Sequence, residues 1–136
     1  FKEQDMTFRL ISVVTLLLVS NFANSAQLAY TCTVARVYTL SDSGTIEVSL
    51  FERHLKGSAF SVSRVTGEII GEVVPTLMAK STRVVNQGSK ENSFKAVADF
   101  GEQYQLLEVL EFRPGDVKPF VAASMGGAGI VTGTCK

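Results

Sequence analysis

The chain has 136 residues, 46% of them hydrophobic, and its 13 basic and 13 acidic residues give a formal net charge of zero at pH 7. The charges are scattered along the chain with no basic stripe, so neither nucleic acid nor an anionic membrane surface is expected as a partner. With two cysteines and one histidine, the chain contains no cluster of metal-ligand spacing, and we expect neither a metal nor another cofactor.

The first 26 residues have the order of a secretory signal peptide. A basic start is followed by the apolar run LISVVTLLLV and then by small residues that include Ser25 and Ala26. The run is about half as long as the roughly 20 residues that a membrane-spanning helix needs. We predict that residues 1–26 are upstream residues and a signal peptide, that residues 27–136 form a single β domain, and that the product is periplasmic or secreted. A retained anchor and a buried N-terminal helix are the alternatives.

The two cysteines, Cys32 and Cys135, lie near opposite ends of the predicted mature chain. In an oxidising compartment, two cysteines in a small domain are most simply one disulfide. This bond would close a loop of about 100 residues, for which the chain-entropy estimate is about 4.7 kcal/mol. We therefore predict a disulfide that joins the first strand to the last. A metal or redox pair is the alternative, although the spacing is not C-x-x-C.

Residues 27–136 contain short runs of β-branched and aromatic residues, separated by turns rich in Gly, Ser, Asn and Pro. Gly67 is placed to supply the turn of a hairpin between two of these runs. The pattern predicts an all-β fold of about eight strands, as a small antiparallel barrel or sandwich. In chain order the runs are 28–40, 45–54, 59–64, 68–74, 81–85, 94–100, 104–112, 118–125 and 130–135.

Two of these runs carry more specific expectations. In the run 45–54, Ile46, Val48 and Leu50 alternate with polar residues and are expected on one face. The run 104–112 is rich in Leu and Glu, which also favour a helix, but its valine and phenylalanine and the flanking turns favour a strand.

If residues 104–112 form a strand, Glu108 and Glu111 face opposite sides of it, because side chains alternate along a strand. One carboxylate then lies on the apolar side and needs a partner. The candidate partners are Arg36, Arg64 and Arg83. The resulting pair would bind a ligand or act as a structural ion pair. A β-bulge, or a barrel mouth open to water, would make such a partner unnecessary.

No motif in the chain indicates catalysis. The only histidine, His54, lies in the charged sequence FERHLKG, which is typical of a surface position. The glycine cluster GGAG at residues 126–129 precedes a predicted strand and lacks the Lys-Ser/Thr ending of a phosphate-binding loop, so we interpret it as a turn. We expect no catalytic residues and no enzyme activity.

Two stretches resemble a group of short exported β-rich proteins of proteobacteria. They are FSVSRVTGEIIG at Phe60–Gly71 and the chain from SFKAVADF to the closing TGTCK. The pattern of that group is F-x-V-x-R-x-T-G, S-F-K, L-E-V-x-E-F, K-P-F and T-G-T-C. Ser63 stands where an acidic residue often precedes the arginine in that group, so that acidic partner for Arg64 is missing here. The resemblance implies an exported β domain and assigns no catalytic residue.

The chain also resembles the periplasmic inhibitors of c-type lysozymes, which are small β-barrels. The resemblance rests on the Y-x-C strand at Tyr30–Cys32 and on the cysteine of the closing GTCK. The Ser-Gly-x-x-Tyr loop of those inhibitors is missing, so inhibition would need another surface.

Three functions follow as hypotheses. The first is a non-catalytic envelope or secreted domain that binds a protein, a glycan or a small ligand. The second is an inhibitor of a lysozyme-type hydrolase, which would insert the loop 86–93 or the glycine cluster into an enzyme cleft. The third is a hydrolase that uses two carboxylates.

Overall fold

The structure is a computed structural model that describes residues 27–125 and 129–136. The predicted signal peptide and most of the glycine cluster, at residues 126–128, lie outside the described residues. The described elements are β1 (Ala29–Leu40), β2 (Ile46–Val48), α2 (Glu52–Leu55), β3 (Ala59–Ser63), β4 (Ile69–Gly71), β5 (Ser81–Gln87), β6 (Phe94–Asp99), β7 (Tyr104–Val109), β8 (Lys118–Met125) and β9 (Gly129–Cys135). The all-β prediction is confirmed, with one short helix among the described residues.

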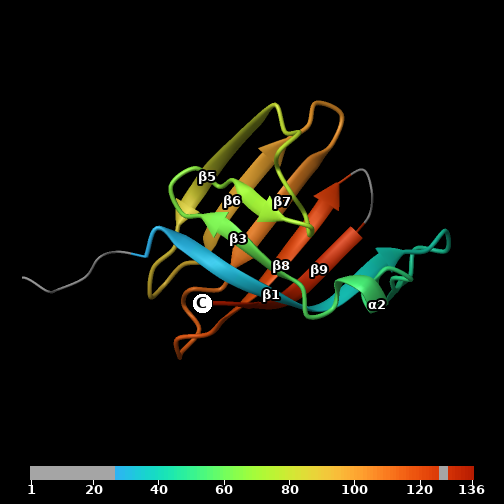
Figure 1. Ribbon diagram of the computed structural model, residues 1–136, viewed down its shortest axis with the longest axis horizontal. Helices are drawn as coiled ribbons and strands as arrows, with labels where there is room; N and C mark the ends of the chain where they lie inside the picture. Colours follow the sequence, from blue (N-terminus) through green and yellow to red (C-terminus); the bar gives the residue numbers. More distant parts are fainter. Residues whose placement is uncertain (1–26, 126–128) are drawn as a thin grey trace, which may run out of the picture.

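All the strands belong to one antiparallel sheet, which curls into a half-barrel (Figure 1). The strand order is β4-β3-β1-β9-β8-β7-β6-β5, and β2 pairs with the far end of β1. A single curled sheet matches the barrel alternative rather than the sandwich, which needs two sheets packed face to face.

Strands β1 and β9 are neighbours in this order and are joined by the predicted disulfide. Cys32 lies directly opposite Cys135, and both side chains are fully buried. The neighbouring pair, Thr31 and Lys136, exchanges two backbone hydrogen bonds of 3.0 and 2.9 Å. The cysteines therefore occupy a non-hydrogen-bonded position, where opposite Cα atoms come closest in an antiparallel pair.

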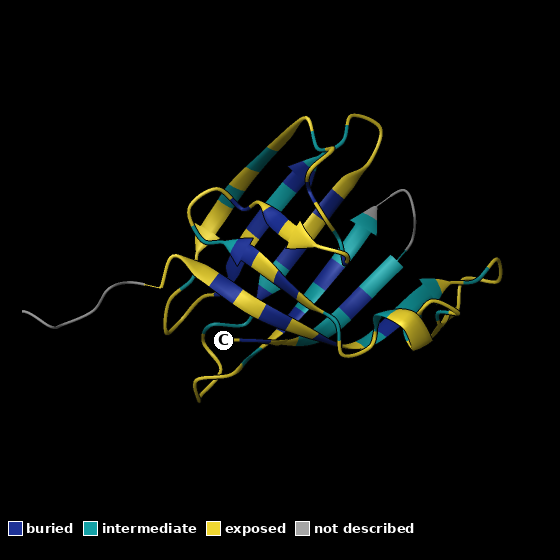
Figure 2. Cartoon of the chain, viewed as in Figure 1, coloured by how far each residue is buried: buried dark blue, intermediate teal, exposed yellow. Residues whose placement is uncertain are grey.

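The core lies on the concave side of the sheet and is built from alternate residues of the strands. In the first half of β1, Tyr30, Cys32 and Val34 are buried while the residues between them are exposed, as the alternating colours of Figure 2 show. Aromatic rings join strands across the core, with Phe60 packed edge-on against Phe120 at a centroid distance of 5.3 Å. Burying one such side chain contributes about 1.5–3 kcal/mol.

Two glycines meet specific steric demands. Gly67 has a φ of 78° and turns the predicted hairpin between β3 and β4, which is confirmed. Gly133 lies opposite a β-bulge in β1, and a Cβ at this position would overlap the carbonyl oxygen of Thr33. The absence of a side chain at Gly133 thus lets β1 and β9 approach each other.

The prediction of a strand over residues 45–54 is wrong for its second half. Strand β2 ends at Val48, and residues 52–55 form the helix α2. Because β2 pairs only with the last three residues of β1, it extends beyond the core and buries none of its own residues. The three alternating apolar residues of this run therefore face no core: Ile46 and Val48 are half exposed, and Leu50 is 88% exposed.

Residues 104–112 are a strand and not a helix, but the strand β7 stops at Val109. Leu107 and Val109 point into the core. The chain then turns, with a 3.1 Å hydrogen bond from the Arg113 N–H to the Leu110 carbonyl oxygen. Glu111 thus lies just beyond the strand, at the end of the core.

Breaking the disulfide is expected to lower the free energy of unfolding. Its cysteines are 103 residues apart, and the chain-entropy estimate for such a loop is about 4.7 kcal/mol. Urea titration of the oxidised protein and of the double variant Cys32→Ala, Cys135→Ala measures the loss.

The reduced wild-type protein is the control for packing, because it keeps both buried sulfur atoms. It should unfold at a lower urea concentration than the oxidised protein. Equal midpoints for the oxidised and reduced proteins would contradict a stabilising role of the cross-link.

Candidate functional site

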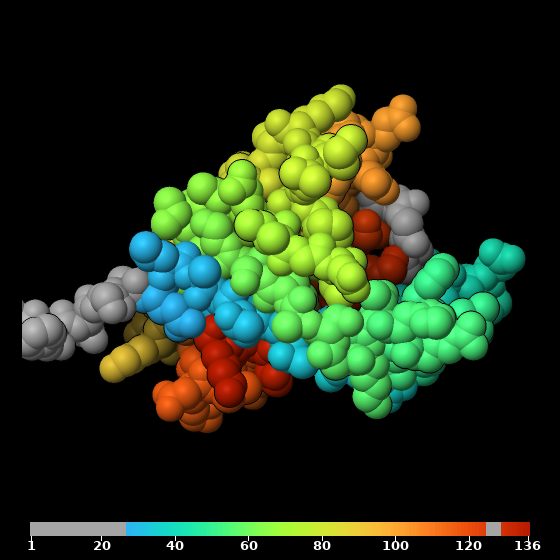
Figure 3. Space-filling view, in the orientation of Figure 1, coloured from blue at the N-terminus to red at the C-terminus, as the bar shows by residue number. Residues whose placement is uncertain are grey.

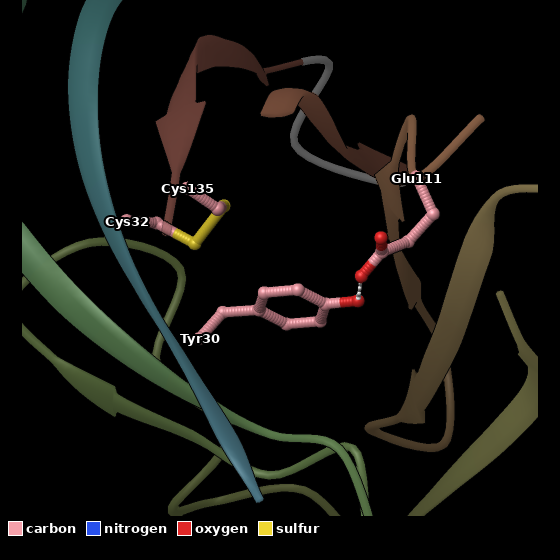
Figure 4. Close-up of a disulfide and its surroundings, with 4 residues drawn as sticks. All are labelled: Tyr30, Cys32, Glu111 and Cys135. Carbon is pink, nitrogen blue, oxygen red and sulfur yellow. Dashed lines mark hydrogen bonds between the residues drawn. A yellow bond between two sulfur atoms is a disulfide. The ribbon is translucent and has the colours of Figure 1, made fainter. Parts of the chain in front are cut away.

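One cluster of polar side chains lies partly buried at the end of the core. It consists of Tyr30 from β1, Arg64 from the turn after β3, and Glu111 from the turn after β7, and we call it the Tyr–Arg–Glu cluster. Figure 4 shows the Tyr30 hydroxyl directed at the carboxylate of Glu111, below the disulfide. Residues that are 81 positions apart in the chain thus meet here.

A single carboxylate oxygen receives two contacts in this cluster. The Tyr30 hydroxyl donates a hydrogen bond to Glu111 Oε1, and Arg64 Nη2 lies 3.3 Å from the same oxygen. The Arg64 guanidinium also stacks on the Tyr30 ring, 4.7 Å from its centroid. A second contact of Arg64 Nη2, 3.4 Å long, reaches the carbonyl oxygen of Gln87 at the end of β5. The cluster therefore ties strands from both halves of the curled sheet.

Burial makes these partners necessary. Only 16% of the Glu111 side chain and 28% of the Arg64 side chain are exposed. A carboxylate withdrawn from water is costly unless it is paired, and here both a cation and a hydroxyl supply that pairing. Burial raises the pKa of Tyr30 well above its ordinary value, and the hydrogen bond to Glu111 raises it further. The Tyr30 hydroxyl therefore stays protonated and donates its hydrogen bond to Glu111.

The cluster forms one wall of a surface depression of about 650 Å³, which we call the base depression. Its charged rim combines Lys118 and Lys136 with the carboxylate of Asp116. Lys118 is partly engaged, since its ammonium group donates a 2.6 Å hydrogen bond to the Arg113 carbonyl oxygen. The complete lining is Gln27, Tyr30, Arg64, Glu111, Gly115, Asp116, Val117, Lys118 and Lys136. A concave surface with charges of both signs suits a polar or zwitterionic group of a ligand.

The other predicted site residues lie elsewhere. Glu108 faces the outer side of the sheet, where its carboxylate lies 3.7 Å from the ammonium group of Lys95, and both side chains are exposed. Arg83 is an exposed residue of β5 and forms no ion pair with any described residue. Of the two candidate carboxylates and three candidate arginines, only Glu111 and Arg64 meet.

Arg36 pairs with an acidic residue that the sequence analysis did not single out. Its Nε donates a 2.9 Å hydrogen bond to Glu52, and the Val37 N–H donates one of 3.0 Å to the same oxygen. These two hydrogen bonds lower the pKa of Glu52, and the one from the Val37 N–H has the larger effect. The contact fastens the short helix α2 to β1, so its role is structural.

Two polar residues of the core escaped sequence reasoning. Tyr30 lies on the buried face of β1 with Cys32, but nothing in its sequence context shows that its hydroxyl would meet Glu111. Gln105 is buried on β7, and its side-chain amide donates a 2.6 Å hydrogen bond to the Val74 carbonyl oxygen. Its position, two residues before the inward Leu107, is the only signal in the sequence.

The described residues show neither a group of side chains suited to bind a metal nor a catalytic setting for His54. His54 is exposed on α2 and accepts a hydrogen bond from its neighbour Arg53. In the part of the chain that the structure describes, no three His, Cys, Asp or Glu residues are grouped so that they could hold a metal ion. None of the helices within residues 27–125 and 129–136 is long and apolar enough to cross a membrane.

Comparison of the chain with protein-family models, with curated proteins and with solved structures finds no match.

Replacing Glu111 is expected to destabilise the protein more than replacing Glu108. Glu111→Ala leaves the Tyr30 hydroxyl and Arg64 without their shared acceptor, which should cost about 1–3 kcal/mol. Glu108→Ala removes only an exposed pair, and its effect should stay within about 0.5 kcal/mol. Chemical denaturation of the two variants gives the comparison, and equal losses would contradict the structural role of Glu111.

The contribution of Tyr30 to the free energy of unfolding is expected to decrease in alkaline solution. An unfolded tyrosine ionises near its ordinary pKa of about 10, whereas burial keeps Tyr30 protonated in the folded protein. The unfolded state therefore binds fewer protons above that pH, and stability falls as the pH rises. The gap in unfolding free energy between wild type and Tyr30→Phe should shrink across this range. A gap that stays constant in urea titrations on both sides of this pKa would refute the assignment.

Proposed function

We propose that the protein is a small exported β domain that binds a protein, a glycan or a small ligand and catalyses no reaction. The observation that carries this proposal is the base depression, a concave and mixed-charge surface at the end of a rigid, disulfide-linked sheet. Pockets of this size lie within the range of about 300–1,000 Å³ that is typical of ligand sites.

The state of Glu111 favours binding over catalysis. Its Oε1 already accepts from Tyr30 and contacts Arg64, so this oxygen is committed to holding the fold. A carboxylate that acts as nucleophile or general acid needs an oxygen directed at its substrate. Glu111 suits the role of a fixed polar wall, against which the exposed parts of Lys118 and Lys136 orient a ligand.

Export is supported by two independent features. The leader has the three parts of a signal peptide, and the two cysteines form a buried disulfide, a bond typical of oxidising compartments. Both agree with the resemblance to short exported proteins of proteobacteria. We infer a periplasmic or secreted location.

Inhibition of a lysozyme-type hydrolase is a second candidate function, and the loop 86–93 favours it. Hydrogen bonds within the loop fix its conformation. The Gly88 N–H donates to the side-chain oxygen of Asn86 at 2.9 Å, and the Ser89 N–H donates to the Asn92 carbonyl oxygen at 2.9 Å. A loop that is already ordered loses little conformational freedom when it binds.

A carboxylate-based hydrolase is the third candidate. Its specific support is that Asp116 lines the same depression as Glu111, so two acidic side chains share one concave surface. It predicts turnover of a substrate that is abolished in Glu111→Gln.

Site-specific photo-crosslinking tests the proposed function. A photoreactive amino acid replaces Val117, a half-exposed residue of the base depression, and the protein is illuminated in an extract of the cell envelope. The matched control carries the same group at Val48, which is similarly exposed on β2, outside the depression. We expect an adduct from position 117 alone.

Mass spectrometry identifies the captured molecule, which is then incubated with wild-type protein. It should be recovered chemically unchanged. No adduct at position 117, equal adducts at both positions, or turnover of the captured molecule would each overturn the proposal. Loss of c-type lysozyme activity in the presence of the wild-type protein, without an adduct at position 117, would establish the inhibitor alternative instead.

A further inference from the structure

The disulfide Cys32–Cys135 lies between the sheet and the packed core, out of reach of solvent. Both cysteines are 0% exposed. They belong to the same hydrophobic cluster as Tyr30, Val34 and Phe120. A disulfide forms or breaks when a thiolate attacks a disulfide sulfur atom, so the rate of exchange depends on access to the sulfur. A reagent in solution therefore cannot attack this bond in the folded protein.

The strands that carry the cysteines lie inside the sheet and not at its edges. Strand β1 lies between β3 and β9, and β9 lies between β1 and β8. Phe60 of β3 is opposite Cys32, and Lys118 of β8 is opposite Cys135. Figure 3 shows the start of β1, in blue, between green atoms of β3 and red atoms at the C-terminal end. Loosening of an edge strand therefore leaves both sulfur atoms covered.

The end of β9 is fastened on both of its sides. The Thr31 N–H donates a 3.0 Å hydrogen bond to the Lys136 carbonyl oxygen, and the Lys136 N–H donates one of 2.9 Å to the Thr31 carbonyl oxygen. On the other side, Cys135 is paired with β8. Peeling this end away would break the pairing with β1 and with β8 at the same time. The sulfur atoms thus become accessible only when β1 and β9 separate.

The chemistry of exchange also needs space inside the core. One cysteine thiolate attacks the disulfide of a donor, which forms a mixed disulfide and releases the first donor thiolate. The second cysteine thiolate then attacks the mixed disulfide and releases the second donor thiolate. Two electrons pass from the cysteines to the donor, whose two thiolates take up the two protons. The mixed disulfide would place part of the donor beside Cys32 or Cys135, and a close-packed interior has no room for it.

We propose that folding seals this disulfide. The bond forms on the open chain, by exchange with a disulfide donor that reaches the cysteines before β1 pairs with β9. It does not exchange again while the sheet is intact. The bond is therefore a permanent cross-link and not a reversible redox switch. This inference does not depend on the proposed function, because it requires no ligand.

Reduction kinetics test the seal. The oxidised wild-type protein is incubated with dithiothreitol at a series of urea concentrations, and the released thiols are alkylated and counted by intact mass. Reduction without urea should be about a thousandfold slower, or more, than in denaturing urea, because unfolded molecules are that rare under native conditions. By microscopic reversibility, formation of the bond by oxidised dithiothreitol follows the same route.

The dependence on urea distinguishes global from local opening. At dithiothreitol concentrations where the rate is proportional to the reagent, opening of the sheet is at equilibrium. The logarithm of the rate constant should then rise linearly with urea, with the slope that the free energy of unfolding shows in the same urea range. A rate constant that does not change with urea below the unfolding midpoint would overturn the proposal, because a local opening would then reach the sulfur atoms.

The pair Pro119 and Thr134 provides an exposed control disulfide. These residues lie opposite each other in β8 and β9, and both are exposed. The control variant carries Cys32→Ala and Cys135→Ala together with Pro119→Cys and Thr134→Cys, and circular dichroism checks that it is folded. Its disulfide should be reduced without urea within about tenfold of its rate in denaturing urea, since its sulfur atoms are accessible.

The wild-type kinetics decide the proposal even if the control variant does not fold. Reduction of the wild-type protein without urea at a rate within about tenfold of the denatured rate would refute the seal. A folded control variant whose exposed disulfide is reduced as slowly as the buried one would also contradict it, because access would then not be the limiting factor.

Discussion

The junction of β1 with β9, locked by the disulfide Cys32–Cys135, is the constraint on which the rest of the sheet depends. Strands β3 and β4 extend the sheet from β1, whereas β8 to β5 extend it from β9. Pairing the first strand with the last requires closing a loop of about 100 residues, and the entropy of that closure opposes folding. Once the covalent bond is formed, the denatured chain has already lost part of its conformational entropy. Pairing β1 with β9 then costs less entropy on folding.

The Tyr–Arg–Glu cluster is a second, noncovalent tie between the two halves. Arg64 belongs to the β1 side of the order, and Gln87 and Glu111 belong to the β9 side, so their contacts hold the curl of the sheet. Because the tie is made of polar groups at the end of the core, it also creates a polar wall beside the base depression. The same residues thus stabilise the fold and shape the surface proposed to bind a ligand.

Much of the fold, and less of the site, could be predicted from the sequence. Alternation in β1 and β6 indicated those strands, whereas β7 was predicted from its valine and phenylalanine and its flanking turns. The predicted export signal made the disulfide the simplest pairing. Alternation misled at residues 45–54, because β2 lies beyond the core and its pattern reflects no buried face. Because Glu108 and Glu111 are three residues apart, the sequence predicted that only one of them lies on the apolar side of the sheet. Which one it is follows only from the structure, where Leu107 and Val109 form the inward face of β7. The choice of Arg64 over two other arginines depends on the curl of the sheet, which no local pattern encodes.

Peptide mapping by mass spectrometry under non-reducing conditions, after free thiols are blocked, tests the central claim most directly. The account predicts a single cross-linked species that joins the peptide containing Cys32 to the peptide containing Cys135 and that disappears on reduction. Recovery of both cysteines in blocked form without reductant would contradict it, because the first and last strands would then be held by backbone pairing alone.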